Sequence, residues 1–125
     1  MVALGWEARV SVVEGRAEAL ARDPDLRAAF SLVVARSFAS PSVTAEIGGA
    51  FLTVGGCLAV SEPNEAGPAR DGPHRWPAAK LAELGLDPAD MAIGDGARAA
   101  VMRRFRPVDD RWPRSAGRSA KRALW

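Results

Sequence analysis

Apolar runs separated by turn-forming residues divide the 125-residue chain into short alternating segments. Two runs, 30–35 and 57–60, are nearly continuous in apolar side chains and predict strands buried on both faces. A β-branched run with charged ends, 9–14, predicts an earlier strand. Because a helix-forming segment separates each of these runs from the next, the three strands are expected to lie parallel.

Helices are predicted between these strands. Good helix formers fill 17–22. Ser40-Pro41 is a cap followed by a first-turn proline, which predicts a helix that runs on to Val54 and stops at Gly55-Gly56. The pair Gly48-Gly49 inside this helix predicts close packing or a weak helix.

The last third of the chain predicts a short helix over 77–84 and then an antiparallel hairpin. Two strand-forming runs, 91–93 and 99–102, flank a turn at Gly94-Asp95-Gly96. The order of elements therefore predicts an α/β fold with three parallel strands plus a C-terminal antiparallel hairpin.

Any ligand site is expected where the predicted parallel strands end, because ligands bind at that edge of such sheets. Segments 14–18, 36–38 and 61–63 follow the three strands. Arg36 is the most informative residue there, since a cation directly after a buried strand must leave the core and face this edge. A salt bridge to a nearby glutamate is the alternative reading of Arg36.

Charge is distributed unevenly, although the net charge is only +2. Residues 1–102 carry a net charge of −4 and residues 103–125 a net charge of +6. A cationic end on a mildly acidic body indicates a polyanionic partner, and a solvated basic tail without a partner is the alternative. We expect an α/β domain over 1–107 and a basic tail over 108–125.

Motifs that carry chemistry are weak. Gly94 to Ala99 matches a glycine-rich nucleotide loop, but a hairpin turn fits its position better. His74 and Cys57 are the single histidine and cysteine, so no metal site is expected, and no catalytic residue can be named. Trp76 and Trp112 follow basic residues and suit stacking on bases, or else packing against the core.

The chain also lacks an apolar run of the length of a membrane helix and a basic, apolar start like that of a secretory signal. A single cysteine fits a reducing compartment. We therefore expect a cytoplasmic protein with no membrane contact.

The order of several runs resembles the second half of the GidB/RsmG family over about residues 3 to 124. The runs are Val12-Val13-Glu14-Gly15-Arg16-Ala17-Glu18, then Val33-Val34-Ala35-Arg36-Ser37-Phe38, then Val54-Gly55-Gly56-Cys57-Leu58, and the tail from Arg111 to Leu124. The resemblance implies a partial Rossmann-like class I methyltransferase sheet. It also implies S-adenosylmethionine-dependent methylation of small-subunit ribosomal RNA at a guanine N7.

The resemblance assigns roles to a few residues. Ala17 and Glu18 would border the adenine end of S-adenosylmethionine, with Arg16 a neighbour, and Arg36 matches a position that contacts the cofactor. Guanine N7 offers a free lone pair to the sulfonium methyl, so catalysis would rest on positioning. Tail residues would bind RNA phosphates and bases: Arg111, Trp112, Arg114, Arg118, Lys121 and Arg122.

The chain departs from the family in three respects. The glycine-rich cofactor loop and the acidic residue that holds the ribose lie upstream of the matched region in the family, and neither occurs here, so weak cofactor binding is expected. The basic residue usual after the fifth strand is replaced around Ser61-Glu62. Two other hypotheses are a non-catalytic RNA-binding module and a truncated fragment that pairs with another chain, or with itself, through an exposed sheet edge.

Overall fold

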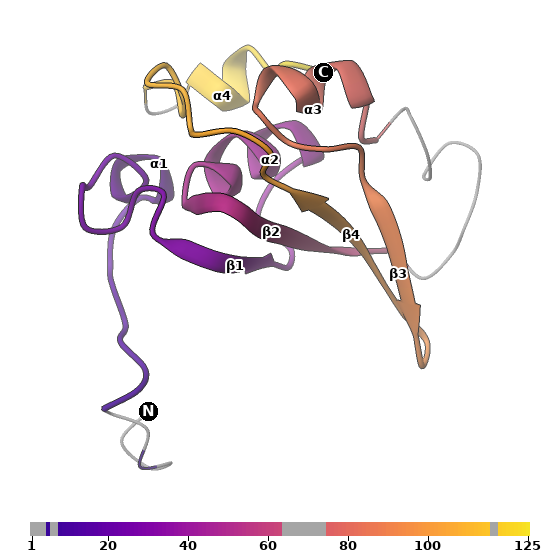
Figure 1. The fold of residues 1–125 in the computed structure, drawn as a ribbon, viewed down its shortest axis with the longest axis horizontal. Helices are drawn as coiled ribbons and strands as arrows, with labels where there is room; N and C mark the ends of the chain where they lie inside the picture. The colour runs from indigo at the N-terminus through magenta and orange to yellow at the C-terminus, as the bar shows by residue number, and fades with distance from the viewer. Residues whose placement is uncertain (1–4, 6–7, 64–74, 116–117) are drawn as a thin grey trace.

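The computed structural model describes residues 5, 8–63, 75–115 and 118–125 (Figure 1). In this part of the chain helices alternate with strands, as the apolar pattern predicts. The elements are α1 (Ala17–Leu20), β1 (Phe30–Ala35), α2 (Pro41–Gly49), β2 (Leu52–Glu62), α3 (Ala78–Glu83), β3 (Asp90–Gly94), β4 (Ala97–Arg103) and α4 (Arg118–Lys121).

The strands form one mixed sheet in the order β1-β2-β4-β3. β1 runs parallel to β2, and the hairpin of β3 and β4 adds to β2 in the antiparallel direction. Gly96 has a φ of +71° in the hairpin turn, as an Asp-Gly turn requires. The predicted α/β class and hairpin are therefore confirmed, but the described sheet contains two parallel strands instead of three.

The predicted strand over 9–14 is wrong. The segment forms no strand, and Val12 and Val13 are 85% and 54% exposed. A β-branched sequence only favours an extended backbone, and a strand also needs a neighbour that satisfies its N–H and C=O groups. Residues 9–14 are not part of the described sheet and pair with none of its strands.

The helix α2 is shorter than predicted, and β2 is longer. Helix α2 ends at Gly49, and Gly55-Gly56 lie within β2 instead of stopping a helix. A Cβ on Gly56 would come within 2.9 Å of the Phe30 carbonyl oxygen, where the pairing of β1 with β2 shifts register. These glycines therefore allow close approach of two backbones at an irregularity in the sheet.

Helices α2, α3 and α4 lie on one side of the sheet (Figure 1). Alternate residues of β2 and β4, such as Leu58, Val60 and Met102, point into the core beneath them. A Cβ on Gly48 would lie 3.0 Å from Leu58 Cδ1, so the close packing predicted for the glycine pair is present.

None of the described helices covers the opposite face of the sheet (Figure 1). Leu32 and Val34 of the edge strand β1 are 61% and 72% exposed, which corrects the prediction that this strand is buried on both faces. A wide hollow of about 800 Å³ lies on this face, lined by residues that include Val34, Ala59, Ala92 and Ala99. No helix in the described residues is long and apolar enough to span a bilayer.

Arg104 joins α2 and α3 from inside the core. The residue is 2% exposed, and its guanidinium donates to the carbonyl oxygens of Gly49, at 2.6 Å, and Leu84, at 3.0 Å. These carbonyls end the two helices, so a buried cation satisfies acceptors that the helix ends leave open. Burial, with a contribution from nearby Arg106, lowers the pKa of Arg104 to about 10, and the side chain remains charged at neutral pH.

Candidate functional site

The carboxyl ends of β1 and β2 lie side by side and form the candidate site. Residues 36–38, which follow β1, and residues 61–63, which end β2 and follow it, line one hollow of about 310 Å³. We call it the strand-end hollow. Ser37 has a φ of +52°, so the chain turns sharply after β1 and returns toward the start of α2. The structure thus brings together two of the three segments that the sequence placed at this edge.

Arg36 is exposed at the rim of the strand-end hollow. Among the described residues it has no hydrogen-bond or ion-pair partner, so the alternative reading as a structural salt bridge is not observed there. A guanidinium in this position can accept an oxyanion such as a carboxylate or a phosphate.

Ala17 and Glu18 lie at the beginning of α1. Ala17 borders a smaller hollow of about 150 Å³, whose wall also contains Ala35 and Phe38 from the end of β1. Arg16 Nε donates to Glu18 Oε1 at 2.6 Å, and this hydrogen bond lowers the pKa of the Glu18 carboxyl. The third predicted segment therefore reaches the same region of the molecule through Ala17.

A buried carboxylate forms the inner wall of the strand-end hollow. Glu62, whose side chain is 0% exposed, accepts two hydrogen bonds from Arg75, at 2.6 Å from Nε and 2.8 Å from Nη2. Arg75 was not among the residues that the sequence pattern indicated. A glutamate at the end of a buried strand predicts a cationic partner, because a buried carboxylate needs one. The sequence does not indicate which cation is that partner.

The two tryptophans noted in the sequence are both packed into the core. Trp76 and Trp112 are each 5% exposed and belong to the main hydrophobic cluster. Of the two interpretations, stacking on bases and packing against the core, the structure shows packing against the core. Arg111 lies over the Trp112 ring, 4.5 Å from its centroid.

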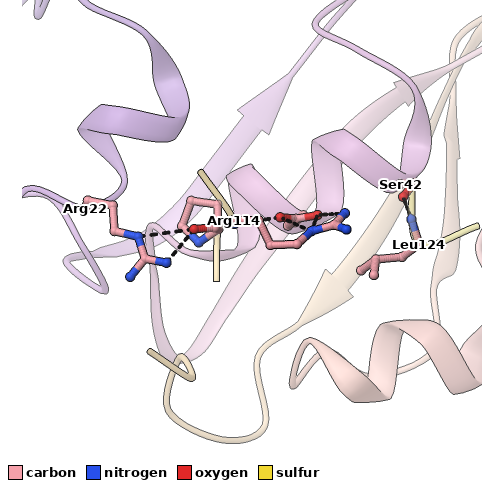
Figure 2. A network of polar contacts seen from close by, with 6 residues as sticks. Arg22, Ser42, Arg114 and Leu124 are labelled. Atoms are coloured by element: carbon pink, nitrogen blue, oxygen red, sulfur yellow. Dashed lines mark hydrogen bonds and ion pairs between the residues drawn. The ribbon is translucent and has the colours of Figure 1, made fainter. Parts of the chain in front are cut away.

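Arg114 is occupied within the protein. Its backbone N–H and its guanidinium donate to the carboxylate of Glu46, which is 0% exposed on α2, with the shortest contact 2.7 Å from Nη2 to Oε1 (Figure 2). Arg22 holds the preceding turn through the carbonyl oxygen of Pro113 (Figure 2). Arg27 donates to the carbonyl oxygen of Trp112 at 2.6 Å. Residues 109–114 thus fold back against α2 and the turn after α1.

The remaining cations predicted to bind RNA are on the surface. Arg111 precedes the buried Trp112, and Arg118, Lys121 and Arg122 lie on or beside α4; all four are exposed. Beyond α4 the chain docks again, because the Leu124 N–H donates to Ser42 Oγ at 2.9 Å (Figure 2). The basic surface is therefore held on the body of the protein at both ends.

His74 and Cys57 are the single histidine and the single cysteine that the sequence offers. His74 lies outside the described residues. Among the residues that are described, no group of three or more His, Cys, Asp or Glu side chains could hold a metal ion. Cys57 is a half-buried free thiol on β2.

The mixed sheet and its strand-end site are compatible with part of a methyltransferase-like α/β fold. No family model matches the chain. The chain is, however, 32% identical over 121 residues to the ribosomal RNA small subunit methyltransferase G of Deinococcus deserti. This match covers 92% of the chain and 48% of the relative, so the chain spans about half the length of that protein. The similarity supports the GidB/RsmG-like relationship that the sequence runs indicate.

Proposed function

We propose that the chain forms the RNA-binding part, and one side of the cofactor site, of an S-adenosylmethionine-dependent methyltransferase that acts on a guanine N7 of small-subunit ribosomal RNA. The observation that carries the proposal is the strand-end hollow with exposed Arg36 on its rim. Ala17 borders the smaller hollow, which shares Ala35 and Phe38 with it. The sequence similarity to a small-subunit methyltransferase supports the choice of reaction and RNA.

The residues at this edge suit a part of the cofactor. The backbone of Ala17 and the carboxylate of Glu18 would border the adenine, and the Arg36 guanidinium suits the carboxylate of the methionine moiety. When bound, S-adenosylmethionine supplies an electrophilic methyl group on a sulfonium. Guanine N7 has a free lone pair, so the protein needs to bind and orient the two partners, and no general base is required.

The basic surface would bind the RNA. Arg111, Arg118, Lys121 and Arg122 are exposed and available to phosphates, which position a nucleic acid without reading its sequence. Trp112 and Arg114 are packed or paired within the protein, so in this proposal they act by holding the tail in place.

Filter binding of the 125-residue chain to a small-subunit ribosomal RNA fragment tests the RNA half of the proposal. We expect binding at low salt that weakens steeply as the salt concentration rises, because neutralised phosphates release counterions. Failure of the chain to retain this RNA at low salt would contradict the proposed function.

Calorimetry with S-adenosylmethionine tests the cofactor half. We predict weak or undetectable binding to this chain alone, because the resemblance places the glycine-rich loop and the ribose carboxylate outside the matched region. Micromolar affinity would contradict this prediction and favour an enzyme that is complete in these residues. Weak but measurable binding favours the first candidate over the second, a non-catalytic RNA-binding module, because the module predicts RNA binding with no affinity for the cofactor at any concentration.

The exposed edge of β1 supports a further part of the proposal, self-association or pairing with another chain. In the described sheet β1 has a neighbouring strand on one side only, and its Leu32 and Val34 are exposed, so it can act as a template for strand addition.

A further inference from the structure

Residues 9–14, which we call the arm, leave the body of the molecule. Figure 1 shows the chain running along these residues away from the sheet and from the start of α1. Residues 11–14 are all exposed, and the arm pairs with none of the described strands, although its β-branched composition favours a strand. Gly15, which joins the arm to α1, has a φ of +156°, and a Cβ there would lie 3.2 Å from Leu20 Cδ2. A glycine therefore sets the direction in which the arm leaves the body.

The edge strand β1 has the length and the free side that such a segment needs. It contains six residues, as the arm does, and in the described sheet it has a neighbouring strand on one side only. Val34 and Arg36 line the wide hollow on the face that the described helices leave bare. Leu32 shares this face with Val34, because side chains alternate along a strand. The free side of β1 therefore presents two exposed apolar side chains followed by a cation.

One pairing matches the side chains of the arm to this face. In a parallel pairing that sets Val12 beside Val34, the next side chains on the same face lie two residues further along each strand. These are Glu14 and Arg36, a carboxylate and a guanidinium, and opposite charges on neighbouring strands attract. An antiparallel pairing of the same two valines sets Glu14 beside apolar Leu32 instead. Neither Glu14 nor Arg36 has a hydrogen-bond or ion-pair partner among the described residues, so both charges are open to this contact.

We propose that the arm of one copy of this chain adds to β1 of a second copy as a parallel strand, and that the two copies exchange arms about a two-fold axis. A second copy is the occupant because the arm runs away from its own sheet (Figure 1). The arm pairs the backbone groups on the free side of β1, and its exposed valines cover Leu32 and Val34. The exchange closes at a dimer, since each copy gives one arm and receives one. The inference rests on the self-association in the proposed function and names the two segments that meet.

Sedimentation velocity of the full chain over a range of concentrations gives the Kd of the dimer for the wild type and its variants. Val12→Lys changes a side chain that is 85% exposed in a single copy, so the substitution leaves the fold of that copy intact. Ile93→Lys is the matched control, because Ile93 is 73% exposed and lies on β3, the other edge strand of the sheet. Circular dichroism confirms the fold of each variant.

We expect Val12→Lys to raise the Kd by about tenfold, because each substitution removes two symmetry-related contacts. Ile93→Lys should change the Kd by less than about twofold. Glu14→Arg and Arg36→Glu should each weaken the dimer, and the two together should restore it, because the reversed pair has the same attraction.

Equal effects of Val12→Lys and Ile93→Lys overturn the exchange of arms, and so does a combined charge-reversal variant that is no tighter than either single variant. A wild type that forms only larger aggregates also overturns the exchange. Each of these results leaves self-association through some other surface in place. A wild type that remains a monomer overturns the exchange and the proposed self-association together.

Discussion

A single ion pair shows how one residue can be read in two ways. Arg114 belongs to the basic tail, and its charge suggests contact with RNA. In the fold, however, its guanidinium covers the Glu46 carboxylate, which has no exposure to solvent. Removal of one member of a buried ion pair is strongly destabilising, so Arg114 is expected to matter first for stability.

We therefore predict that Arg114→Ala lowers the free energy of unfolding by about 3 kcal/mol. Urea unfolding at neutral pH measures the change. Arg118→Ala is the control, because Arg118 is exposed and should change stability by less than about 0.5 kcal/mol. Equal effects of the two substitutions would show that the Glu46 pair contributes nothing to the fold.

Elements with strong local signals could be predicted from the sequence. Ser40-Pro41 opens α2, Gly85 with a φ of +79° follows α3, and Asp95-Gly96 turns the hairpin. The segment 9–14 has the composition of a strand and fails to form one, because pairing depends on a neighbour that local sequence does not supply. Local signals therefore identify elements better than they identify their partners.

In the candidate site, too, residues with a local signal could be predicted and residues placed by distant contacts could not. Arg36 could be placed at the sheet edge because it directly follows an apolar strand. Arg75 could not, since it reaches the strand-end hollow through its pair with Glu62, a residue 13 positions away in the sequence. Trp112 is buried and Arg114 is paired through contacts with residues far away in the sequence. Composition does not indicate such contacts, and it favoured a solvent-exposed tail.

The junction of β1 and β2 depends on a glycine that the sequence suggested only as a helix stop. A Cβ on Gly56 would lie 2.9 Å from the Phe30 oxygen and 3.0 Å from the Thr53 oxygen, and both are backbone atoms with little freedom to move. We predict that Gly56→Ala costs about 1–3 kcal/mol in thermal or urea unfolding. Gly94→Ala is the matched control, because its Cβ would meet nothing within 4 Å. A neutral Gly56→Ala would contradict the close approach of the two strands.

At the scale of the whole molecule, the described helices cover only one face of the sheet (Figure 1). The exposed side chains of Leu32 and Val34 lie on the edge strand β1, where backbone groups are also available to a second chain. Exposed apolar patches and long bare edges commonly mark association sites.

We predict that the chain dimerises or aggregates at modest concentration and that Leu32→Lys with Val34→Glu shifts it toward monomer. Light scattering and sedimentation velocity report the mass of each species. A wild-type protein that is a monodisperse monomer would contradict the prediction and would mean that the four-stranded sheet is sufficient by itself.

The most direct test of the central claim is the salt dependence of RNA binding when the surface of α4 is neutralised. The triple substitution Arg118→Ala, Lys121→Ala and Arg122→Ala removes exposed charges and leaves the Arg114–Glu46 pair and the Leu124–Ser42 contact in place. Filter binding to a small-subunit ribosomal RNA fragment at several salt concentrations should give a slope flatter than that of the wild type by about two units, with a similar loss for every RNA sequence. An unchanged slope would contradict the account, because the basic tail would then be a solvated end with no RNA partner.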